Sequence, residues 1–573
     1  MNPLAGSIAA SAAALQSTAA PPAAAQVMPG PARRNLLLLI LLLAVVWFGN
    51  LEVRKLIRPD EGRYAEVPRE MVATGDWVTP RQNGLKYFEK PALQYWATAA
   101  AYEVFGIHHW TARLWPALTG FLGVLLTGFA GARFWGLRAG MFAAAISASS
   151  LLYVLIAHIN TLDMGVTFFL CLGLFTLMLA QREDADARAR RNWMWLAWVA
   201  LALAVLSKGL IGAALPAASL IVYTLWSRDW GLWKRLHLGT GLLIFFAVAT
   251  PWFVVVSLRN PEFFQFFFIH EHVDRFLTKA HSRAGPPWYF VPILLLGMLP
   301  WTFLMFDACV RALRFEATPG FQPKRFLLTW ILFVFVFFSA SSSKLPSYIL
   351  PIFPAAALLM GEYLARIRPR LLALHIVPVL ALCIAALFLA PQAARLADVE
   401  VPLALYQAYV PWLIAAALAA TLGAAAALVM ALKSHPLASV ITLSLAGLMS
   451  AQLVLTGHDH LSPASSTYHL IERIKPQLRP DAPFYSISIY DQTLPFYIQR
   501  NVTLVEYTGE LSFGIDQEPG SFMRTYGEFE QRWAADTFAM AIMHPGTLAY
   551  FDRHKVPYVI IARDTRRVIV RKP

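Results

Sequence analysis

Charged side chains are scarce in this chain of 573 residues: they make up 14% of it, against about 25% in an average soluble domain. Hydrophobic residues account for 58%, and apolar runs long enough to cross a bilayer recur from residue 36 to about residue 456. This composition excludes an ordinary soluble enzyme and predicts a polytopic α-helical membrane protein. After residue 456 the chain becomes polar and mixed, which predicts a soluble C-terminal tail.

Cysteine is equally rare, and the three cysteines all fall inside apolar runs: Cys171, Cys309 and Cys383. Their positions show no metal-binding spacing and no disulfide framework, so we interpret them as small buried hydrophobic residues. Residues 1–30 contain no charge and no basic stretch ahead of an apolar core, which is not typical of a secretory signal. We predict a disordered cytoplasmic N-terminus over 1–34 and a retained helix after it.

The net charge of +14 could indicate a nucleic acid or anionic lipid partner, but basic cytoplasmic loops also explain it. Arg33 and Arg34 precede the first apolar run and place the N-terminus inside. If residues 91–105 lie on the membrane surface, every later basic segment falls inside as well. Those segments are 188–192, 228–235, 311–325, 366–370 and Lys433. This topology predicts about thirteen spanning helices, an outside C-terminal tail and no nucleic acid partner.

The remaining polar motifs all fall on the outer side in this topology, although none of them was used to derive it. They are "RPDEGRYAEVPREM" (58–71), "KYFEKP" (86–91), "HINTLDM" (158–164), "SKG" (207–209), "EFFQFFFIHEHVDRF" (262–276) and "SSSKLPSY" (341–348). Ionised groups are hydrated at a helix end, whereas burial in hydrocarbon costs roughly several kcal/mol. The pattern predicts a site for a substrate with a polar head outside and an apolar tail in the bilayer.

Each of these residues alone also has a purely structural explanation. Asp60 and Glu61 could be ordinary loop charges, and Asp163 could be a carboxylate favoured at a helix start. Lys208 could extend its charge to the interface from a helix end. An interfacial aromatic belt would equally explain three tyrosines: Tyr64, Tyr87 and Tyr348. Only their convergence on one side favours a functional site.

The motifs in their order along the chain resemble the lipid A aminoarabinose transferases, which are GT-C glycosyltransferases. The resemblance covers about residue 36 to the C-terminus and rests on "DEGRYAE", "KYFEKPAL", "TARLWPAL", "LDM", "LSKG", "EHVDRF", "SKLPSYILPIFPA" and "YDQTLPFYI". The first motif and the "SKLPSY" segment are shared with protein mannosyltransferase-like membrane enzymes, so they indicate the superfamily. The whole set is more specific.

The resemblance implies a GT-C fold with a periplasmic α/β tail, and therefore a transmembrane catalytic domain over 35–456 and a tail over 457–573. The first periplasmic loop would cover about residues 54–111. The tail itself reads as α/β, because "FYSISIYD" and "PYVIIAR" are typical of strands and 465–478 is typical of a helix. No nucleotide-binding fingerprint occurs there.

The same resemblance implies a reaction. The donor would be undecaprenyl phosphate 4-amino-4-deoxy-L-arabinose, delivered at the periplasmic face of the inner membrane, and the acceptor a phosphate of lipid A. The modification would mask negative charge and give resistance to polymyxin and other cationic peptides. We expect a monomer surrounded by membrane lipids.

Two substrate phosphates require cations, and we choose five basic residues of the outer side as candidates: Arg63, Lys90, Lys208, Arg275 and Lys344. A lipid A phosphate is already ionised at neutral pH, so the reaction needs no strong base. We therefore predict that Asp60 orients substrate and stabilises positive charge at the sugar carbon. If the acceptor were a hydroxyl, Asp60 would be the base. Asp163 and Glu61 are the further catalytic candidates, and the three tyrosines named above are candidate substrate contacts.

A divalent metal, zinc or magnesium, is a candidate cofactor. Glu89 and His270 are the ligands we would choose, one from each of two outside loops. Two ligands fall short of the three or four that a protein zinc site normally has, although substrate phosphates could complete the shell. In the tail, Asp491 and Gln492 either face the membrane site or form a packing turn.

Other functions stay open at this stage. The acceptor could be a protein or another glycan, because pocket shape decides acceptor identity. A lipid-linked sugar flippase would need polar residues at mid-membrane and related halves, and neither pattern is visible. A membrane receptor with a sensory tail would leave Asp60 and Asp163 without a role.

Overall fold

The computed structural model describes residues 30–274, 285–314, 320–507 and 509–573, and the chain divides into two units, 1–49 and 50–573. In the first unit the described residues form one helix, α2 (Gly30–Phe48), whose apolar part is Leu36–Phe48. The helix thus begins before residue 35, where the predicted disordered segment was expected to end. Residues 1–29 of that segment lie outside the described residues.

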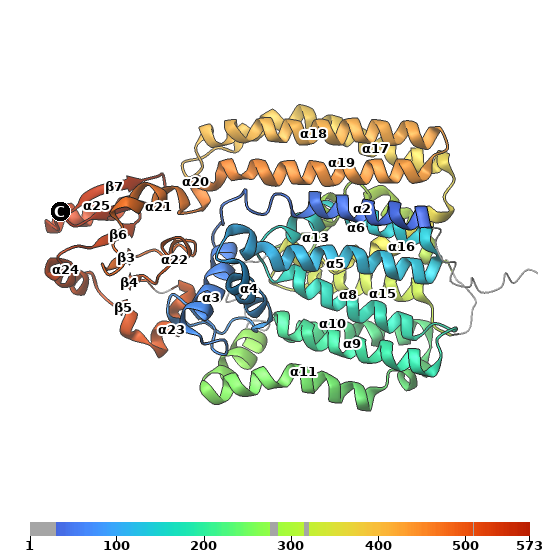
Figure 1. Cartoon of the computed structure of the whole chain (residues 1–573), viewed down its shortest axis with the longest axis horizontal. Helices are drawn as coiled ribbons and strands as arrows, with labels where there is room; N and C mark the ends of the chain where they lie inside the picture. Colours follow the sequence, from blue (N-terminus) through green and yellow to red (C-terminus); the bar gives the residue numbers. More distant parts are fainter. Residues whose placement is uncertain (1–29, 275–284, 315–319, 508) are drawn as a thin grey trace, which may run out of the picture. The chain divides into compact units, whose positions relative to one another are not determined.

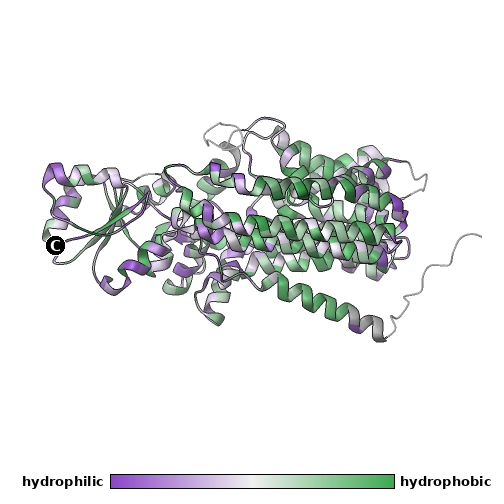
Figure 2. Cartoon of the chain, turned by 90° about the horizontal axis from the view of Figure 1, so that it is seen from above, coloured by the Kyte–Doolittle hydropathy of each residue, from purple (hydrophilic) through white to green (hydrophobic). Residues whose placement is uncertain are grey.

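The second unit contains an α-helical bundle, confirming the prediction of a polytopic helical membrane protein. Seven helices within the described residues are long and apolar enough to cross a membrane. They are α5 (His109–Trp135), α8 (Asp163–Ala180), α11 (Leu238–Arg259), α15 (Pro323–Ala340), α17 (Pro369–Leu389), α18 (Leu403–Leu432) and α19 (Pro436–Gly457). Figure 2 shows hydrophobic residues along this bundle and hydrophilic ones at its ends.

Two bent helix pairs raise the number of spans to as many as nine within the described residues. The pairs are α6 (Leu137–Ser147) with α7 (Leu151–Ala157), bent by 66°, and α13 (Phe290–Gly297) with α14 (Thr302–Ala312), bent by 107°. Three more bundle helices are shorter or carry more charge: α9 (Ala187–Lys208), α10 (Ile211–Ser227) and α16 (Ile352–Arg366). With α2 they would bring the total to about thirteen, which stays a prediction.

Small residues set the closest helix contacts in the bundle. A Cβ on Gly361 of α16 would lie 2.6 Å from the carbonyl oxygen of Ala139 in α6, and one on Gly131 of α5 would lie 2.9 Å from the Cα of Gly140. Lipid tails are as apolar as leucine, so helices in a bilayer associate through such close packing rather than through the hydrophobic effect.

The segment between the first two long helices forms short elements at one end of the bundle (Figure 1). These are α3 (Asp60–Thr74), the hairpin of β1 (Arg81–Gln82) and β2 (Leu85–Lys86), and α4 (Leu93–Phe105). With 13 residues, α4 is about 20 Å long, too short for a hydrocarbon core of about 30 Å. This agrees with the prediction that 91–105 does not span the membrane.

The C-terminal segment folds as an α/β domain, as predicted. Its six-stranded sheet has the order β5-β4-β3-β6-β8-β7; the first four strands are parallel, and β8 is antiparallel to both β6 and β7. The strands are β3 (Phe484–Ile487), β4 (Thr503–Val505), β5 (Phe522–Met523), β6 (Met540–Met543), β7 (Val559–Arg563) and β8 (Val568–Arg571). The strands predicted at 484–491 and 557–563 correspond to β3 and β7.

Helices cover both faces of this sheet. They are α21 (Tyr468–Ile474), α22 (Leu494–Ile498), α23 (Ser512–Gln517), α24 (Tyr526–Ala535) and α25 (Leu548–His554), with α21 inside the predicted helix 465–478. Because side chains alternate along a strand, Phe484 packs with α21 and α3 on one face, whereas Tyr485 packs with α24 and α25 on the other. Helix α3, which begins at Asp60, thus shares a hydrophobic core with the C-terminal domain.

Short turns complete the described chain. They are the helical turns η1 (Trp230–Arg235), η3 (Pro346–Ile349), η4 (Ala390–Leu396), η5 (His458–Leu461), η6 (Lys475–Gln477), η7 (Gly509–Leu511), η8 (Pro519–Ser521) and η9 (Pro545–Thr547), the π-helix η2 (Gln265–Asp274), and α20 (Ser462–Ser465). Helix α19 ends at Gly457, next to the predicted domain boundary, which stays a prediction.

Candidate functional site

A cavity of about 410 Å³ collects most of the predicted site residues. Segments far apart in the sequence line it: α3, residues 89–90, the starts of α8 and α10, the end of α9, η2, and residues 337–351. Eight predicted site residues are among its lining side chains: Asp60, Arg63, Tyr64, Glu89, Lys90, Asp163, Lys208 and Tyr348. The convergence expected from the sequence is therefore present in the fold.

Helix ends position the charged groups of the cavity. Asp60 and Asp163 are the first residues of α3 and α8, where the helix dipole favours a carboxylate, and Lys208 is the last residue of α9, where it favours a cation. The Lys208 ammonium donates a hydrogen bond to the Asp163 carboxylate and lies 4.9 Å from the centre of the Tyr348 ring. Three distant segments thus meet at one ion pair.

The cavity is polar at one end and apolar along its length. On α8, Asp163, Val166 and Leu170 all line it, at spacings that place them on one helix face. Beyond the polar groups the lining is mostly hydrophobic: Leu162, Val166, Leu170, Leu210, Ile211, Ala214, Leu215, Phe337, Phe338, Leu345 and Pro351. Such a cavity fits a molecule with a charged head and a hydrocarbon tail.

Arg63 links the cavity to its surroundings. Its Nη1 donates to Asp60 Oδ1 at 3.1 Å, and its Nη2 donates to Glu510 of the C-terminal domain. The guanidinium also lies 5.9 Å from the ring centres of both Tyr64 and Tyr87. Burial raises the pKa of both phenols, so each hydroxyl stays protonated at neutral pH. Tyr87 does not line the cavity and packs beneath Arg63 instead.

Lys90 stands between two carboxylates. Its Nζ is 3.6 Å from Glu271 Oε2 and 4.0 Å from Glu89 Oε2, and it donates to the Glu89 carbonyl at 2.7 Å. Glu271 lines the cavity but was not among the predicted site residues. Its position next to His270 in a polar motif was the available signal.

The described residues do not fit a metal site built by protein groups alone. Within them, no group of three or more His, Cys, Asp or Glu side chains could hold an ion. Glu89 lines the cavity, whereas His270 does not and has its ring 5.5 Å from that of Phe266. Zinc or magnesium at Glu89 and His270 stays a prediction, and no chemical step below uses a metal.

Glu61 is not in the cavity, and its surroundings argue against the predicted catalytic role. It is completely buried, and its two oxygens accept from Arg113 of α5 at 2.7 and 2.8 Å. They also accept from the backbone N–H of Asn160 at 3.0 Å and of Ile57 at 3.2 Å. Burial alone would raise the pKa of Glu61, but Arg113 and then Arg54 outweigh it and lower the pKa to about 2. We therefore propose that Glu61 is a structural group, ionised at neutral pH.

Lys344 also differs from its prediction as a phosphate ligand. Its ammonium donates to the carbonyls of Phe338, Ser339 and Ser341 at 3.3, 2.8 and 3.0 Å. These bonds use all three N–H donors and satisfy carbonyls at the end of α15. Lys344 does not line the cavity. Arg275, the remaining predicted cation, lies outside the described residues.

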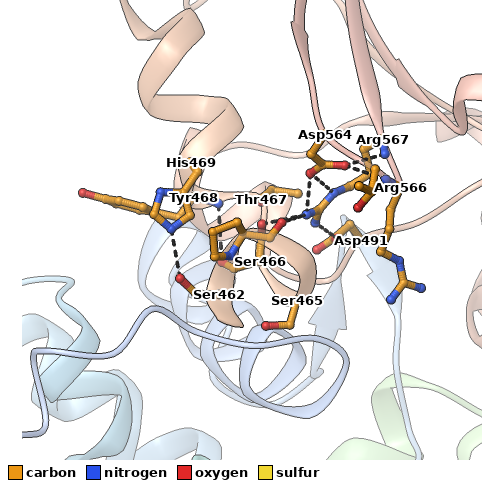
Figure 3. A network of polar contacts seen from close by, with 12 residues as sticks. Ser462, Ser465, Ser466, Thr467, Tyr468, His469, Asp491, Asp564, Arg566 and Arg567 are labelled. Carbon is orange, nitrogen blue, oxygen red and sulfur yellow. Dashed lines mark hydrogen bonds and ion pairs between the residues drawn. The ribbon is translucent and has the colours of Figure 1, made fainter. Parts of the chain in front are cut away.

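The turn at Asp491 and Gln492 is largely a packing feature. Asp491 accepts from Arg567 at 2.6 Å (Figure 3). It also accepts from the Thr493 hydroxyl at 2.7 Å. Gln492 donates to Glu510 at 2.7 Å, and Glu510 in turn accepts from Arg63 at the cavity.

Comparisons with known proteins agree with this geometry. Residues 470–572 match the family described as "Aminoarabinose transferase C-terminal domain", and residues 33–267 match "Dolichyl-phosphate-mannose-protein mannosyltransferase". The undecaprenyl phosphate-α-4-amino-4-deoxy-L-arabinose arabinosyl transferase of Aeromonas salmonicida is 35% identical over 54% of this chain and 56% of its own length, so the chain spans about half the length of that relative. The corresponding protein of Shewanella sediminis is 28% identical over 90% of both chains.

Among solved structures, ArnT from Cupriavidus metallidurans bound to undecaprenyl phosphate is similar with a TM-score of 0.90 and 39% identity. The match covers 94% of this chain and 98% of ArnT, and therefore includes both the helix bundle and the α/β domain. This chain belongs to the aminoarabinose transferase family of GT-C membrane glycosyltransferases.

Proposed function

We propose that this protein transfers 4-amino-4-deoxy-L-arabinose from undecaprenyl phosphate to a phosphate of lipid A. The observation that carries the proposal is the amphipathic cavity, whose charged head region and apolar length suit a polyprenyl phosphate sugar. The similarity of this chain to ArnT, whose structure was solved with undecaprenyl phosphate bound, supports the same donor. The acceptor rests on the family alone.

The charges of the cavity suit a transfer between two anions. Its described lining contains the cations Arg63, Lys90 and Lys208 and the carboxylates Asp60, Glu89, Asp163 and Glu271. The cations would hold the donor phosphate and stabilise the negative charge that develops as undecaprenyl phosphate leaves. Among the carboxylates, the Asp60 side chain is 37% exposed and therefore accessible to substrate.

We assign Asp60 to the sugar rather than to proton removal. An ionised lipid A phosphate attacks without losing a proton, so a base is unnecessary. A carboxylate beside the sugar can accept a hydrogen bond from its amine and stabilise positive charge at the carbon where the bond to phosphate breaks. Asp163, held by Lys208, braces the other side of the cavity.

We further propose that the cavity and the α/β domain face the periplasm, with the bundle in the bacterial inner membrane. The basic segments would then lie on the cytoplasmic side. Lipid-linked donor and lipid A would both reach the cavity laterally from the bilayer, and a single chain supplies every residue assigned above.

The test is expression in a polymyxin-sensitive bacterium that makes the donor but lacks its own transferase, followed by mass spectrometry of lipid A. We expect a mass gain of one aminopentose with the wild type and none with Asp60→Asn. Glu103→Gln is the matched control, because Glu103 is an exposed carboxylate on α4 outside the cavity lining.

An unmodified lipid A with well-expressed wild type would refute the proposed acceptor and favour a protein or another glycan. Movement of the donor across the membrane without any covalent product would favour a flippase instead. A mass gain that persists in Asp60→Asn would keep the function and remove Asp60 from the reaction.

A further inference from the structure

The α/β domain contacts the first turn of α3 at Gly62, which follows Asp60 and Glu61 in the sequence. A Cβ on Gly62 would lie 2.6 Å from the carbonyl carbon of Gln492 and 2.7 Å from the backbone nitrogen of Thr493. Real Cβ atoms do not approach backbone so closely, so only glycine permits this packing. The loop after β3 therefore rests directly on the turn that presents Asp60 to the cavity.

A separate network fixes that loop (Figure 3). Arg567 bonds to Asp491 at 2.6 Å and to Asp564 at 2.7 Å, and it donates to the carbonyls of Pro463 and Ser466, both at 2.9 Å. The latter two residues lie at the junction that follows α19. The buried guanidinium of Arg567 therefore holds three segments together: the loop after β3, the junction after α19, and the connection between β7 and β8.

From this fixed loop a chain of three polar contacts reaches the cavity. Gln492 donates to Glu510 Oε1 at 2.7 Å, Glu510 Oε2 accepts from Arg63, and Arg63 donates to Asp60 at 3.1 Å. Arg63 is buried, and both of its terminal nitrogens are engaged by carboxylates, one from each domain. Its Nε has no hydrogen-bond partner among the described residues.

We propose that Glu510 and Gln492 are positioning residues for the transfer, which hold the Arg63 guanidinium at one fixed distance from Asp60. The inference rests on the proposed function. The α/β domain then takes part in the reaction through Arg63, although neither residue lines the cavity. Glu510 also shares the charge of Arg63, so the arginine does not pair with Asp60 alone and the Asp60 carboxylate remains available to the sugar.

A second ion pair between the same two regions offers a matched control. Arg81, on the hairpin after α3, bonds to Glu518 of the α/β domain at 2.7 and 3.1 Å. Neither residue lines the cavity. If these contacts only dock the domain, Glu510→Gln and Glu518→Gln will behave alike. If Glu510 positions Arg63, only Glu510→Gln will change the chemistry.

The experiment measures kcat and the KM for the donor with purified full-length protein, undecaprenyl phosphate aminoarabinose and lipid A. We expect kcat of Glu510→Gln to fall about ten- to a hundredfold below that of Glu518→Gln, the cost of a misplaced catalytic group. The KM for the donor should fall or stay constant, because the released Arg63 binds phosphate more freely. If the substitutions only reduced the amount of folded enzyme, the apparent kcat would fall in both variants and the KM of each would equal that of the wild type.

A kcat difference below fivefold between the two variants would overturn the inference. Transfer that is absent in the wild type would instead refute the proposed function and the inference with it. Should Glu510→Gln fail to fold, Gln492→Met removes only the amide contact to Glu510, and its kcat should fall in the same direction by a smaller factor. An unchanged kcat in Gln492→Met would then overturn the inference.

Discussion

The buried pair of Glu61 and Arg113 makes the most quantitative prediction. Both side chains are 0% exposed, and Glu61 accepts four hydrogen bonds, two from Arg113 and two from backbone N–H groups. Glu61→Gln keeps the size of the side chain but replaces one oxygen with an N–H donor. Whichever oxygen is lost, one Arg113 donor and one backbone donor lose their acceptor.

The magnitude follows from the general costs of broken buried contacts and from the pKa of Glu61. An unsatisfied buried donor costs about 1–3 kcal/mol, and more when it is charged, while removing one partner of a buried ion pair costs about 3–5 kcal/mol. The lowering of the pKa of Glu61 from 4.5 to about 2 corresponds to about 3 kcal/mol. We therefore expect Glu61→Gln to destabilise the folded protein by about 3–5 kcal/mol.

The pH dependence has a definite sign. Because the folded pKa lies below the unfolded one, the ionised Glu61 contributes its full stability above about pH 4.5 and loses it as the pH falls towards 2. The loss of folding free energy in Glu61→Gln should therefore be the same at every pH between about 5 and 8, where Glu61 is ionised in both the folded and the unfolded wild type.

The assay is an unfolding titration in mixed micelles, followed by tryptophan fluorescence at pH 7. The matched control is Glu472→Gln, because the ion pair of Glu472 with Lys475 is 3.0 Å long but exposed on α21 and η6. An exposed pair is worth about 0–1 kcal/mol. If Glu61→Gln costs no more than Glu472→Gln, the structural role of Glu61 is refuted.

Three further predictions concern single residues. Lys208→Met should raise the KM for the donor about tenfold or more, because a charged hydrogen bond is worth about 1.5–3 kcal/mol. The assay is steady-state kinetics. A change in kcat alone would contradict a role of Lys208 in phosphate binding. Gly62→Ala should destabilise the folded protein by about 1–3 kcal/mol, because the new Cβ would overlap the backbone of Gln492. Gly239→Ala is the control: a Cβ there meets nothing within 4 Å, so it should be neutral or stabilising in the same unfolding titration. Equal effects of the two substitutions would show that the close approach at Gly62 is not the cause. Burial raises the pKa of Glu70 to about 8, so the folded protein binds this proton more tightly than the unfolded chain, and stability should fall as the pH rises from about 4.5 to 8. Glu70→Gln should flatten this pH dependence. Melting temperatures of the variant that run parallel to those of the wild type from pH 5 to pH 9 would disprove the prediction.

Much of the architecture was readable from the sequence because membrane insertion follows local composition. Runs of apolar residues predict helices wherever they occur, and the strand-forming residues of 484–491 predict a strand, β3, without knowledge of its neighbours. Loop charges also predicted that the polar motifs share one side of the bundle. Eight of the predicted site residues line one cavity for this reason.

The role of each charged residue within those motifs could not be read in the same way. Asp60 and Glu61 are neighbours in the sequence, yet consecutive helical residues point about 100° apart, so one faces the cavity and the other meets Arg113. Lys208 ends one long helix and Lys344 follows another, yet Lys208 donates to the Asp163 carboxylate whereas Lys344 donates to backbone carbonyls. In both cases the difference lies in the groups that pack nearby.

The sequence by itself determined the class of protein, the apolar helices and the α/β tail, because each depends on residues close together in the chain. Only the tertiary structure decided that Glu61 contacts Arg113 and that Glu510 contacts Arg63, 447 positions away. A side chain's chemistry depends on the charges and hydrogen-bond partners around it, and these come from segments that the fold alone brings together.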